Sequence, residues 1–319
     1  MKARLVINPI SGTRSKEGLD QYVASRLSPL GWEIETVYTR CHGDATRLGL
    51  EAVDRGYDAV FAAGGDGTVN ETAAALCGSQ TALGIIPCGS GNGLARHLGI
   101  PIDVKEGVKV LEQEKAHAID YATVGERKFF CTFGVGFDAA VSEAFAKKKT
   151  RGKLTYFQST FQTYARFQPE LYTISANGKT LTERAFLVAV CNASQYGNNA
   201  YIAPHASIDD GLLDVTIIHA GNTLSTALVG FDMLTGMIEK NVLIETFRTP
   251  SLTIFRSADG PAHLDGEPIQ LGTTLDIDCH HAQLNVISAP GEPRITPFIT
   301  PATAMFNDFK LAVGNLFHK

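Results

Sequence analysis

The chain has 319 residues, of which 44% are hydrophobic and 19% are charged, and its formal net charge is −5. This composition excludes a disordered chain, and the acidic balance argues against a general nucleic-acid-binding protein. The length predicts two domains, each large enough for its own hydrophobic core.

The cysteines and the N-terminal segment indicate a compartment. The six cysteines are scattered and none forms a CxxC pair, so we expect reduced thiols and neither a disulfide framework nor a zinc site. The opening segment, MKARLVINPISG, has too short an apolar core for a signal peptide. No run approaches the roughly 20 apolar residues of a membrane span. We therefore expect a soluble, cytoplasmic protein.

Residues 1–122 alternate between strand and helix patterns. The apolar runs predict buried strands in ARLVINP, WEIETVYT, YDAVFAAGG and ALGIIPCG, and helical composition is found in residues 15–30 and in TVNETAAALC. Such alternation predicts an α/β domain with a parallel sheet and helices on both faces. Four turns rich in Gly, Asn or Thr lie near the predicted strand ends where such sheets bind ligands: NPISG, TRCHGDA, GGDGTVNE and CGSGNG.

Residues 123–289 contain short β-type runs separated by turn residues. The runs are KFFCTFGVGF, ELYTISANG, RAFLVAVCNAS, LLDVTIIHA, SLTIFRS, TLDIDCH and AQLNVIS. The pair Asn177-Gly178 marks a hairpin, and two helical stretches occupy residues 154–167 and 224–238. We predict a mostly antiparallel β-sandwich as the second domain. Residues 290–319 are predicted as a tail whose helix packs back on the first domain.

The stretch AAGGDGTVNE leaves a predicted strand through three glycines that surround Asp66. Glycine lets the backbone come close to a ligand, and the N-terminus of the next helix gathers backbone N–H groups around one point. This pattern predicts a phosphate-binding turn, with an ordinary Gly-rich turn as the alternative. Beside a phosphate, Asp66 has to support Mg²⁺, hold a water or fix the loop. A second glycine motif, GVGFDA at Gly134, has dinucleotide-turn spacing but lies in the predicted antiparallel region.

The series of motifs resembles the diacylglycerol kinase catalytic family, which includes bacterial lipid kinases and the sphingosine and ceramide kinases. The first domain carries NPISG, TxxxGDA (Thr39 to Ala45), GGDGTVNE and PCGSGNGLARHLGIP, and the second carries GVGFDA, KKKTRGKLTY, DDGLLDV and HLDGE. The resemblance covers nearly the whole chain. It implies an ATP-dependent lipid kinase that converts diacylglycerol to phosphatidic acid. The alternatives are a sphingoid-base or ceramide-type kinase, an NAD kinase-like enzyme, and a non-catalytic nucleotide- or lipid-sensing protein.

The resemblance also implies a set of site residues. Those that would bind ATP are Asn8, Ser11, Thr39, Gly64, Gly65, Asp66, Gly67, Thr68, Asn70, Glu71 and Ser90. A structural Mg²⁺ would lie on the Asp210 side chain and on the carbonyls of Ser207 and Leu212, with a plain DDG turn as the alternative. One departure is Gly93, where many bacterial members carry an aspartate, and this leaves the lipid acceptor open.

The HLDGE motif presents two carboxylates, Asp265 and Glu267, on a predicted turn between strands. Phosphoryl transfer needs positioning, charge neutralisation and a group that orients the attacking oxygen, and a carboxylate suits the last task. By the resemblance, Glu267 or Asp265 is the base that takes the proton from the acceptor hydroxyl. A solvated hairpin turn is the alternative.

A dense basic run follows GVGFDA and consists of Lys147, Lys148, Lys149, Arg151 and Lys153. Near anionic lipid each such cation contributes about 1 kcal/mol. We therefore expect transient contact with the inner membrane surface, where a lipid substrate would lie, with a solvated helix end as the alternative. We allow for a homodimer, and expect no nucleic-acid partner.

Overall fold

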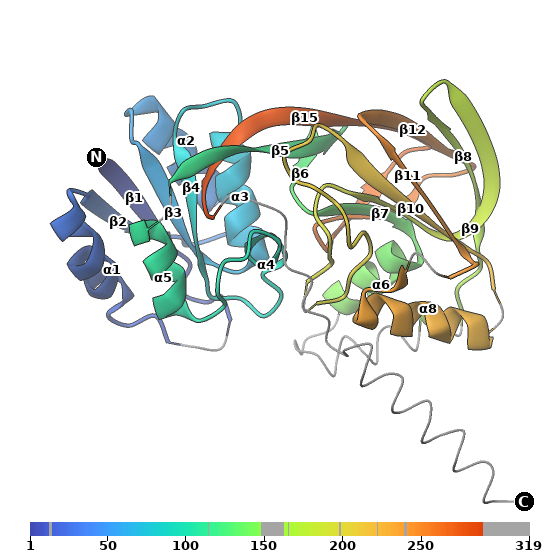
Figure 1. Ribbon diagram of the computed structural model, residues 1–319, viewed down its shortest axis with the longest axis horizontal. Coiled ribbons are helices and arrows are strands. Elements are labelled where there is room, and N and C mark those ends of the chain that lie inside the picture. The colour runs from blue at the N-terminus through green and yellow to red at the C-terminus, as the bar shows by residue number, and fades with distance from the viewer. Residues whose placement is uncertain are drawn as a thin grey trace, which may run out of the picture.

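The computed structural model describes residues 1–12, 15–113, 115–147, 163–164, 166–197, 199–221, 223–238 and 241–289. Two halves lie side by side, and two long strands arch from one half to the other (Figure 1). The predictions for the C-terminal tail, for most of the helix over 154–167 and for the basic run after Lys147 lie outside the described residues.

The first half contains the predicted parallel sheet, in the strand order β4-β3-β1-β2. Its strands are β1 (Lys2–Ile7), β2 (Glu33–Tyr38), β3 (Ala59–Gly64) and β4 (Ala82–Pro87). Its helices are α1 (Leu19–Leu27), α2 (Asp44–Asp54), α3 (Asp66–Leu76), α4 (Gly93–His97) and α5 (Val104–Gln113), with a 3₁₀ turn η1 (Ser28–Leu30). Every residue of β3 and β4 is buried, which is why these strands are continuous apolar runs.

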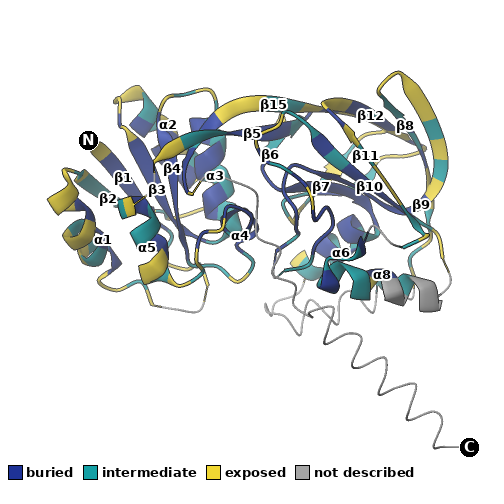
Figure 2. Ribbon diagram, viewed as in Figure 1, coloured by how far each residue is buried: buried dark blue, intermediate teal, exposed yellow. Residues whose placement is uncertain are grey.

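The second half is mostly antiparallel, so the predicted fold class is confirmed. Its strands are β5 (Ala116–Val124), β6 (Arg127–Phe129), β7 (Thr132–Gly136), β8 (Glu170–Ala176), β9 (Lys179–Cys191), β10 (Leu213–His219), β11 (Ile244–Thr249), β12 (Ser251–Arg256), β13 (Gly260–Leu264), β14 (Glu267–Leu271) and β15 (Thr274–Ile287). Among the described residues of this half, the helices are α6 (Phe137–Ala146) and α8 (Thr223–Thr235). One hydrophobic core is formed by side chains of the strands alone. A second is formed between the sheet and the helices α6 and α8. Buried residues follow the strands of both halves (Figure 2).

Two predicted strand runs differ from the structure. KFFCTFGVGF forms two strands, β6 and β7, because the chain bends at residues 130–131. TLDIDCH and AQLNVIS form one strand, β15, whose register shifts between His280 and Leu284 where Ala282 adopts a φ of +54°. The Asn177-Gly178 hairpin is confirmed, with φ values of +52° and +70°.

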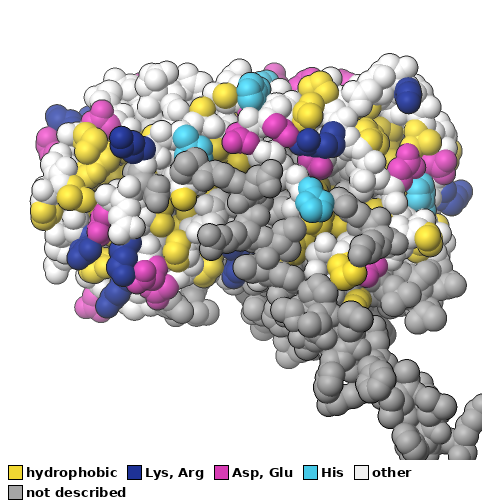
Figure 3. Space-filling model, in the orientation of Figure 1, with side chains coloured by type: hydrophobic (Ala, Val, Ile, Leu, Met, Phe, Trp, Pro, Cys, Tyr) yellow, Lys and Arg dark blue, Asp and Glu magenta, His cyan; other side chains and the backbone are white. Residues whose placement is uncertain are grey.

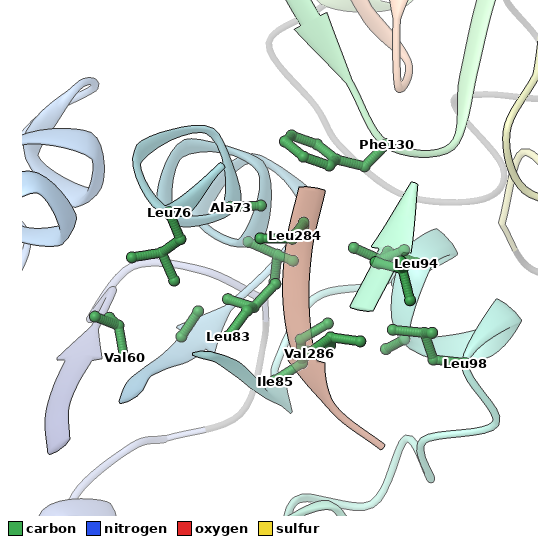
Figure 4. Close-up of a cluster of buried hydrophobic side chains, with 14 of the residues drawn as sticks. Val60, Ala73, Leu76, Leu83, Ile85, Leu94, Leu98, Phe130, Leu284 and Val286 are labelled. Carbon is green, nitrogen blue, oxygen red and sulfur yellow. The ribbon is translucent and has the colours of Figure 1, made fainter. Parts of the chain in front are cut away.

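Strand β15 joins the two halves. It pairs with β12 and β5, and Val286 then pairs with Leu83 of β4 in the parallel sheet. Leu284 and Val286 are fully buried between the side chains of β4 and α4 (Figure 4). Each such side chain contributes roughly 1.5–3 kcal/mol when it is buried. The predicted boundary after residue 122 falls within β5, which runs along β15.

Strand β1 of the parallel sheet contains a buried arginine, Arg4. The side chain of Arg4 is 2% exposed and donates to Glu35 at 2.6 Å and to the carbonyl oxygen of Leu48 at 2.9 Å. The Tyr57 hydroxyl donates to the same oxygen of Glu35 at 2.6 Å. These hydrogen bonds, first that of Tyr57 and then that of Arg4, lower the pKa of Glu35 to about 2.

This pKa predicts an acid-labile contribution to stability. Because the folded pKa of Glu35 lies below that of an unfolded glutamate, about 4.3, the contribution is complete above that value and is lost as the pH falls towards 2. We expect Glu35→Gln to flatten the dependence of the urea midpoint on pH between 5 and 2. The matched control is Glu33→Gln at an exposed position of the same strand. An unchanged slope in Glu35→Gln would contradict the assignment.

Candidate active site

Glycine-containing turns follow β1, β3 and β4, and their backbones are in close contact at the carboxyl edge of the parallel sheet. Gly12 has a φ of +64°, and a side chain there would collide with the carbonyl oxygen of Cys88. A Cβ on Gly89 would lie 2.6 Å from the Cα of Gly65. These glycines are therefore required by the close approach of one backbone to another, which the sequence alone did not reveal.

Asp66, the first residue of α3, fixes one glycine turn against the other. Its carboxylate accepts the backbone N–H of Asn92 at 2.9 Å and that of Gly93 at 2.7 Å. Asn92, which sequence reasoning did not single out, closes the turn by pairing both ways with Gly89, at 3.1 and 2.8 Å. Its φ of +52° lies in the left-handed region that asparagine tolerates in turns, and the signal available in the sequence was an asparagine between the glycines of CGSGNG.

The remaining predicted nucleotide residues line the same edge. Asn8 donates to the Thr68 hydroxyl at 2.9 Å, and the Ser11 hydroxyl donates to the Asn8 carbonyl oxygen at 3.2 Å. Thr39 follows β2, and Ser90 is exposed in the turn after β4. The first N–H groups of α3 lack partners within the helix, as at every helix start, and so suit an anion.

Glu71 supports the turn that follows β2. Its carboxylate accepts the backbone N–H of Gly43 at 2.9 Å and of Ala45 at 3.1 Å, and it pairs with His42 at 2.8 Å. Four turns, after β1, β2, β3 and β4, are thereby held at one edge of the sheet. Along the sheet these turns lie in the order β4, β3, β1, β2, which differs from their order in the chain.

The second half contributes the hairpin between β13 and β14. Asp265 and Gly266 form its two-residue turn with φ values of +50° and +86°, the pattern of a type I′ turn and the reason for an Asp-Gly pair. The backbone N–H of Asp265 donates to the carbonyl oxygen of Thr132 at 2.8 Å. The turn is therefore anchored to the start of β7.

The carboxylate of Asp265 is fully engaged. One oxygen accepts the backbone N–H groups of Cys131 at 2.7 Å and Thr132 at 2.8 Å. The other accepts the N–H of Phe130 and the side-chain amide of Asn70, both at 2.9 Å. Removal from water raises the pKa of Asp265 to about 6, and the three backbone amides act in the opposite direction. Asp265 is therefore ionised at neutral pH but has no lone pair left for a substrate.

Glu267 differs from Asp265 although it lies only two residues away. Its side chain is exposed and has no hydrogen-bond partner among the residues that the structure describes. Its Oε1 lies 3.9 Å from the place that a Cβ on Gly67 would occupy. A free carboxylate of the second half therefore faces the GGDGT turn of the first.

The predicted Mg²⁺ residues lie together in the segment before β10, and the predicted carboxylate, that of Asp210, has partners of its own. The Asp210 carboxylate forms an ion pair with Arg248 and accepts the Leu212 N–H at 3.1 Å, and the Ser207 hydroxyl donates to Asp209 at 2.6 Å. Within the described ranges, no group of three or more His, Cys, Asp and Glu side chains has a metal-binding arrangement. In this arrangement Arg248 pairs with the one predicted carboxylate, and a magnesium site on these residues stays a prediction.

Two surface features complete the description. A cavity of about 230 Å³ in the second half is bounded by β10, β11 and the segment 202–205, away from the glycine turns. Acidic and basic side chains are interspersed on the face shown in Figure 3. None of the helices in the described part of the chain is long and apolar enough to cross a bilayer.

The sequence of the chain is similar to those of known lipid kinases. Residues 2–124 match the diacylglycerol kinase catalytic domain, and residues 131–288 match the YegS C-terminal NAD kinase beta sandwich-like domain. The chain is 33% identical over 227 residues to the diacylglycerol kinase of Bacillus subtilis (strain 168), which covers 69% of this chain and 75% of that protein. It is 31% identical over 272 residues to a protein of Chromohalobacter salexigens named probable lipid kinase YegS-like, covering 83% and 84%.

Solved structures share the fold. The crystal structure of a diacylglycerol kinase from Bacillus anthracis strain Sterne has a TM-score of 0.68 at 21% identity, covering 91% of this chain and 97% of that one. A second crystal structure from the same strain has a TM-score of 0.74 at 24% identity and the same coverage.

Proposed function

The chain belongs to the diacylglycerol kinase family of lipid kinases, and we propose that it transfers the γ-phosphate of ATP to the primary hydroxyl of diacylglycerol. The products are phosphatidic acid and ADP. One observation carries this proposal: the free carboxylate of Glu267 faces the GGDGT turn. A phosphate donor on that turn and an acceptor hydroxyl beside Glu267 would meet between the two halves.

The glycine turns hold the nucleotide. Backbone N–H groups at the start of α3 point at an anion, and Gly64, Gly65 and Gly67 let the phosphates approach the backbone closely. Asp66 acts on the nucleotide indirectly, because its carboxylate holds the neighbouring turn in register. Mg²⁺ bound with ATP supplies neutralisation of the phosphate charge.

Glu267 is the base in this proposal. The acceptor oxygen forms a bond to the γ-phosphorus while the bond from that phosphorus to the β–γ bridging oxygen breaks. The hydroxyl proton moves to the Glu267 carboxylate, and ADP leaves. We assign the role to Glu267 in preference to Asp265, because both oxygens of Asp265 accept two hydrogen bonds each.

Contact with a membrane follows from the acceptor, because diacylglycerol lies in a bilayer. The basic run begins at Lys147, which follows directly after α6 and is 72% exposed at its side chain. In the described part of the chain its ammonium group pairs with Glu143, at 3.3 Å. The exposed ammonium group of Lys147, together with the basic residues that follow it in the sequence, supports reversible docking on anionic lipid.

The test is phosphate transfer by the purified full-length chain. ATP labelled at the γ-phosphate is offered with mixed micelles that contain diacylglycerol, sphingosine or ceramide, and separately with NAD. We expect the label in phosphatidic acid only. If the label appears instead in a sphingoid phosphate, a ceramide phosphate or NADP, that compound's precursor is the acceptor and diacylglycerol is not. Transfer to none of the four would contradict the proposal.

A further inference from the structure

The GVGFDA motif contributes to a buried contact behind the turn that carries Asp265 and Gly266. Asp138 of α6 and His263 of β13 meet with 3.0 Å between Oδ2 and Nε2. Their side chains are 10% and 2% exposed. His263 lies two residues before Asp265, so this pair adjoins the turn from inside the fold.

The hydrogen bonds of His263 indicate which nitrogen of the imidazole is the donor and which is the acceptor. The backbone N–H of Gly266 donates to Nδ1 of His263 at 3.4 Å, so Nδ1 is an acceptor. The ring proton is therefore on Nε2, which donates to Asp138. The Tyr196 hydroxyl donates to the same Asp138 oxygen at 2.8 Å, and the N–H of Ala139 donates to the other oxygen at 2.8 Å.

Gly134 makes room for this pair. A Cβ at that position would collide with Asp138 Oδ2 and with His263 Nε2. The backbone of β7 therefore passes so close to the pair that only glycine fits. The spacing of Gly134 and Asp138 in GVGFDA thus has a physical reason other than nucleotide binding.

We infer that Asp138 and His263 are positioning residues for Glu267, an inference that rests on the proposed function. The first residue of the turn, Asp265, is held by its hydrogen bond to Thr132 at the start of β7. The second residue, Gly266, is held by the hydrogen bond from its backbone N–H to His263. Glu267 follows at once. With both turn residues held, its carboxylate stays over Gly67. Asp138 orients the imidazole so that Nδ1 faces the turn.

Two substitutions of His263 separate the two contacts. In His263→Asn the side-chain oxygen can stand where Nδ1 stood and accept the Gly266 N–H, whereas in His263→Gln the amide can stand where Nε2 stood and reach Asp138. We expect His263→Gln to lower kcat by about 10–100-fold, because small misplacements of a catalytic group cost this much. We expect His263→Asn to keep at least threefold more of kcat than His263→Gln. The KM for ATP should stay within about twofold in both.

The control is His219→Gln, since His219 lies on β10 and pairs with Glu245. It should leave kcat unchanged. Near wild-type kcat in folded His263→Gln would overturn the inference, as would a rise in the KM for ATP with kcat unchanged. The inference would also be overturned if the kcat values of the two His263 variants differed only as their unfolding midpoints differ.

A second readout does not need a substrate. With ¹⁵N-labelled glycine, the exchange of the Gly266 amide is expected to be at least tenfold faster in His263→Gln than in the wild type and in His263→Asn. Equal exchange in all three would overturn the inference. If the wild type transfers no phosphate to diacylglycerol, the proposed function fails, whereas this exchange pattern still tests the role of His263.

Discussion

Replacing Glu267 by glutamine is expected to lower kcat for diacylglycerol by about 10²–10⁴-fold, the usual cost of losing a general base. Glutamine has the same shape but cannot take the hydroxyl proton. The side chain is exposed and has no partner in the described part of the chain, so we expect the unfolding midpoint to change by less than about 2 °C. Initial rates at saturating ATP and a thermal melt measure the two effects.

The matched control for this prediction is Glu126→Gln. Glu126 is also exposed, in the turn between β5 and β6. It should retain wild-type kcat, and the KM for ATP should be similar in both variants. A folded Glu267→Gln protein with near wild-type kcat would remove Glu267 from the mechanism.

Replacing Asp265 by asparagine is expected to impair both stability and rate. Four N–H groups donate to the carboxylate of Asp265. Asparagine replaces one carboxylate oxygen by an NH₂ group, which cannot accept, so at least one of the four N–H groups loses its partner. A buried donor without a partner costs about 1–3 kcal/mol, and we expect the free energy of unfolding to fall by that amount. Displacement of the turn should lower kcat by about 10²-fold. Urea denaturation and initial rates measure these effects.

The control here is Asp259→Asn, an exposed position between β12 and β13. It should change neither quantity appreciably. A large loss of kcat in Asp265→Asn without any loss of stability would point to Asp265 as the base and against its anchoring role.

The strands and the site edge of the first half could be predicted because they depend on local patterns. Continuous apolar runs gave β3 and β4, and the turns that follow each parallel strand necessarily meet at one edge. The bend between β6 and β7 could not be predicted. Its amides turn towards Asp265, more than 130 residues away, and no local pattern contains that contact.

The same reason separates Asp265 from Glu267. Both are carboxylates in one turn, and the sequence leaves either as the base. The difference arises from Asn70, 195 residues away from Asp265, and from the amides of residues 130–132. Asn70 was predicted as a nucleotide residue, and its side-chain amide binds Asp265. Likewise, Asp138 and His263 are 125 residues apart and meet only in the fold.

The central claim, that Asp265 acts on the reaction by holding Glu267, is tested most directly by a double-mutant cycle. The kcat for diacylglycerol is measured for the wild type, Asp265→Asn, Glu267→Gln and the double variant, each under conditions where it is folded. If Asp265 only positions Glu267, Asp265→Asn should lower kcat by less than about threefold once Glu267 is glutamine, because residues that act as a unit are not additive. If the two losses instead multiply, Asp265 acts on the reaction independently of Glu267, and the claim is wrong.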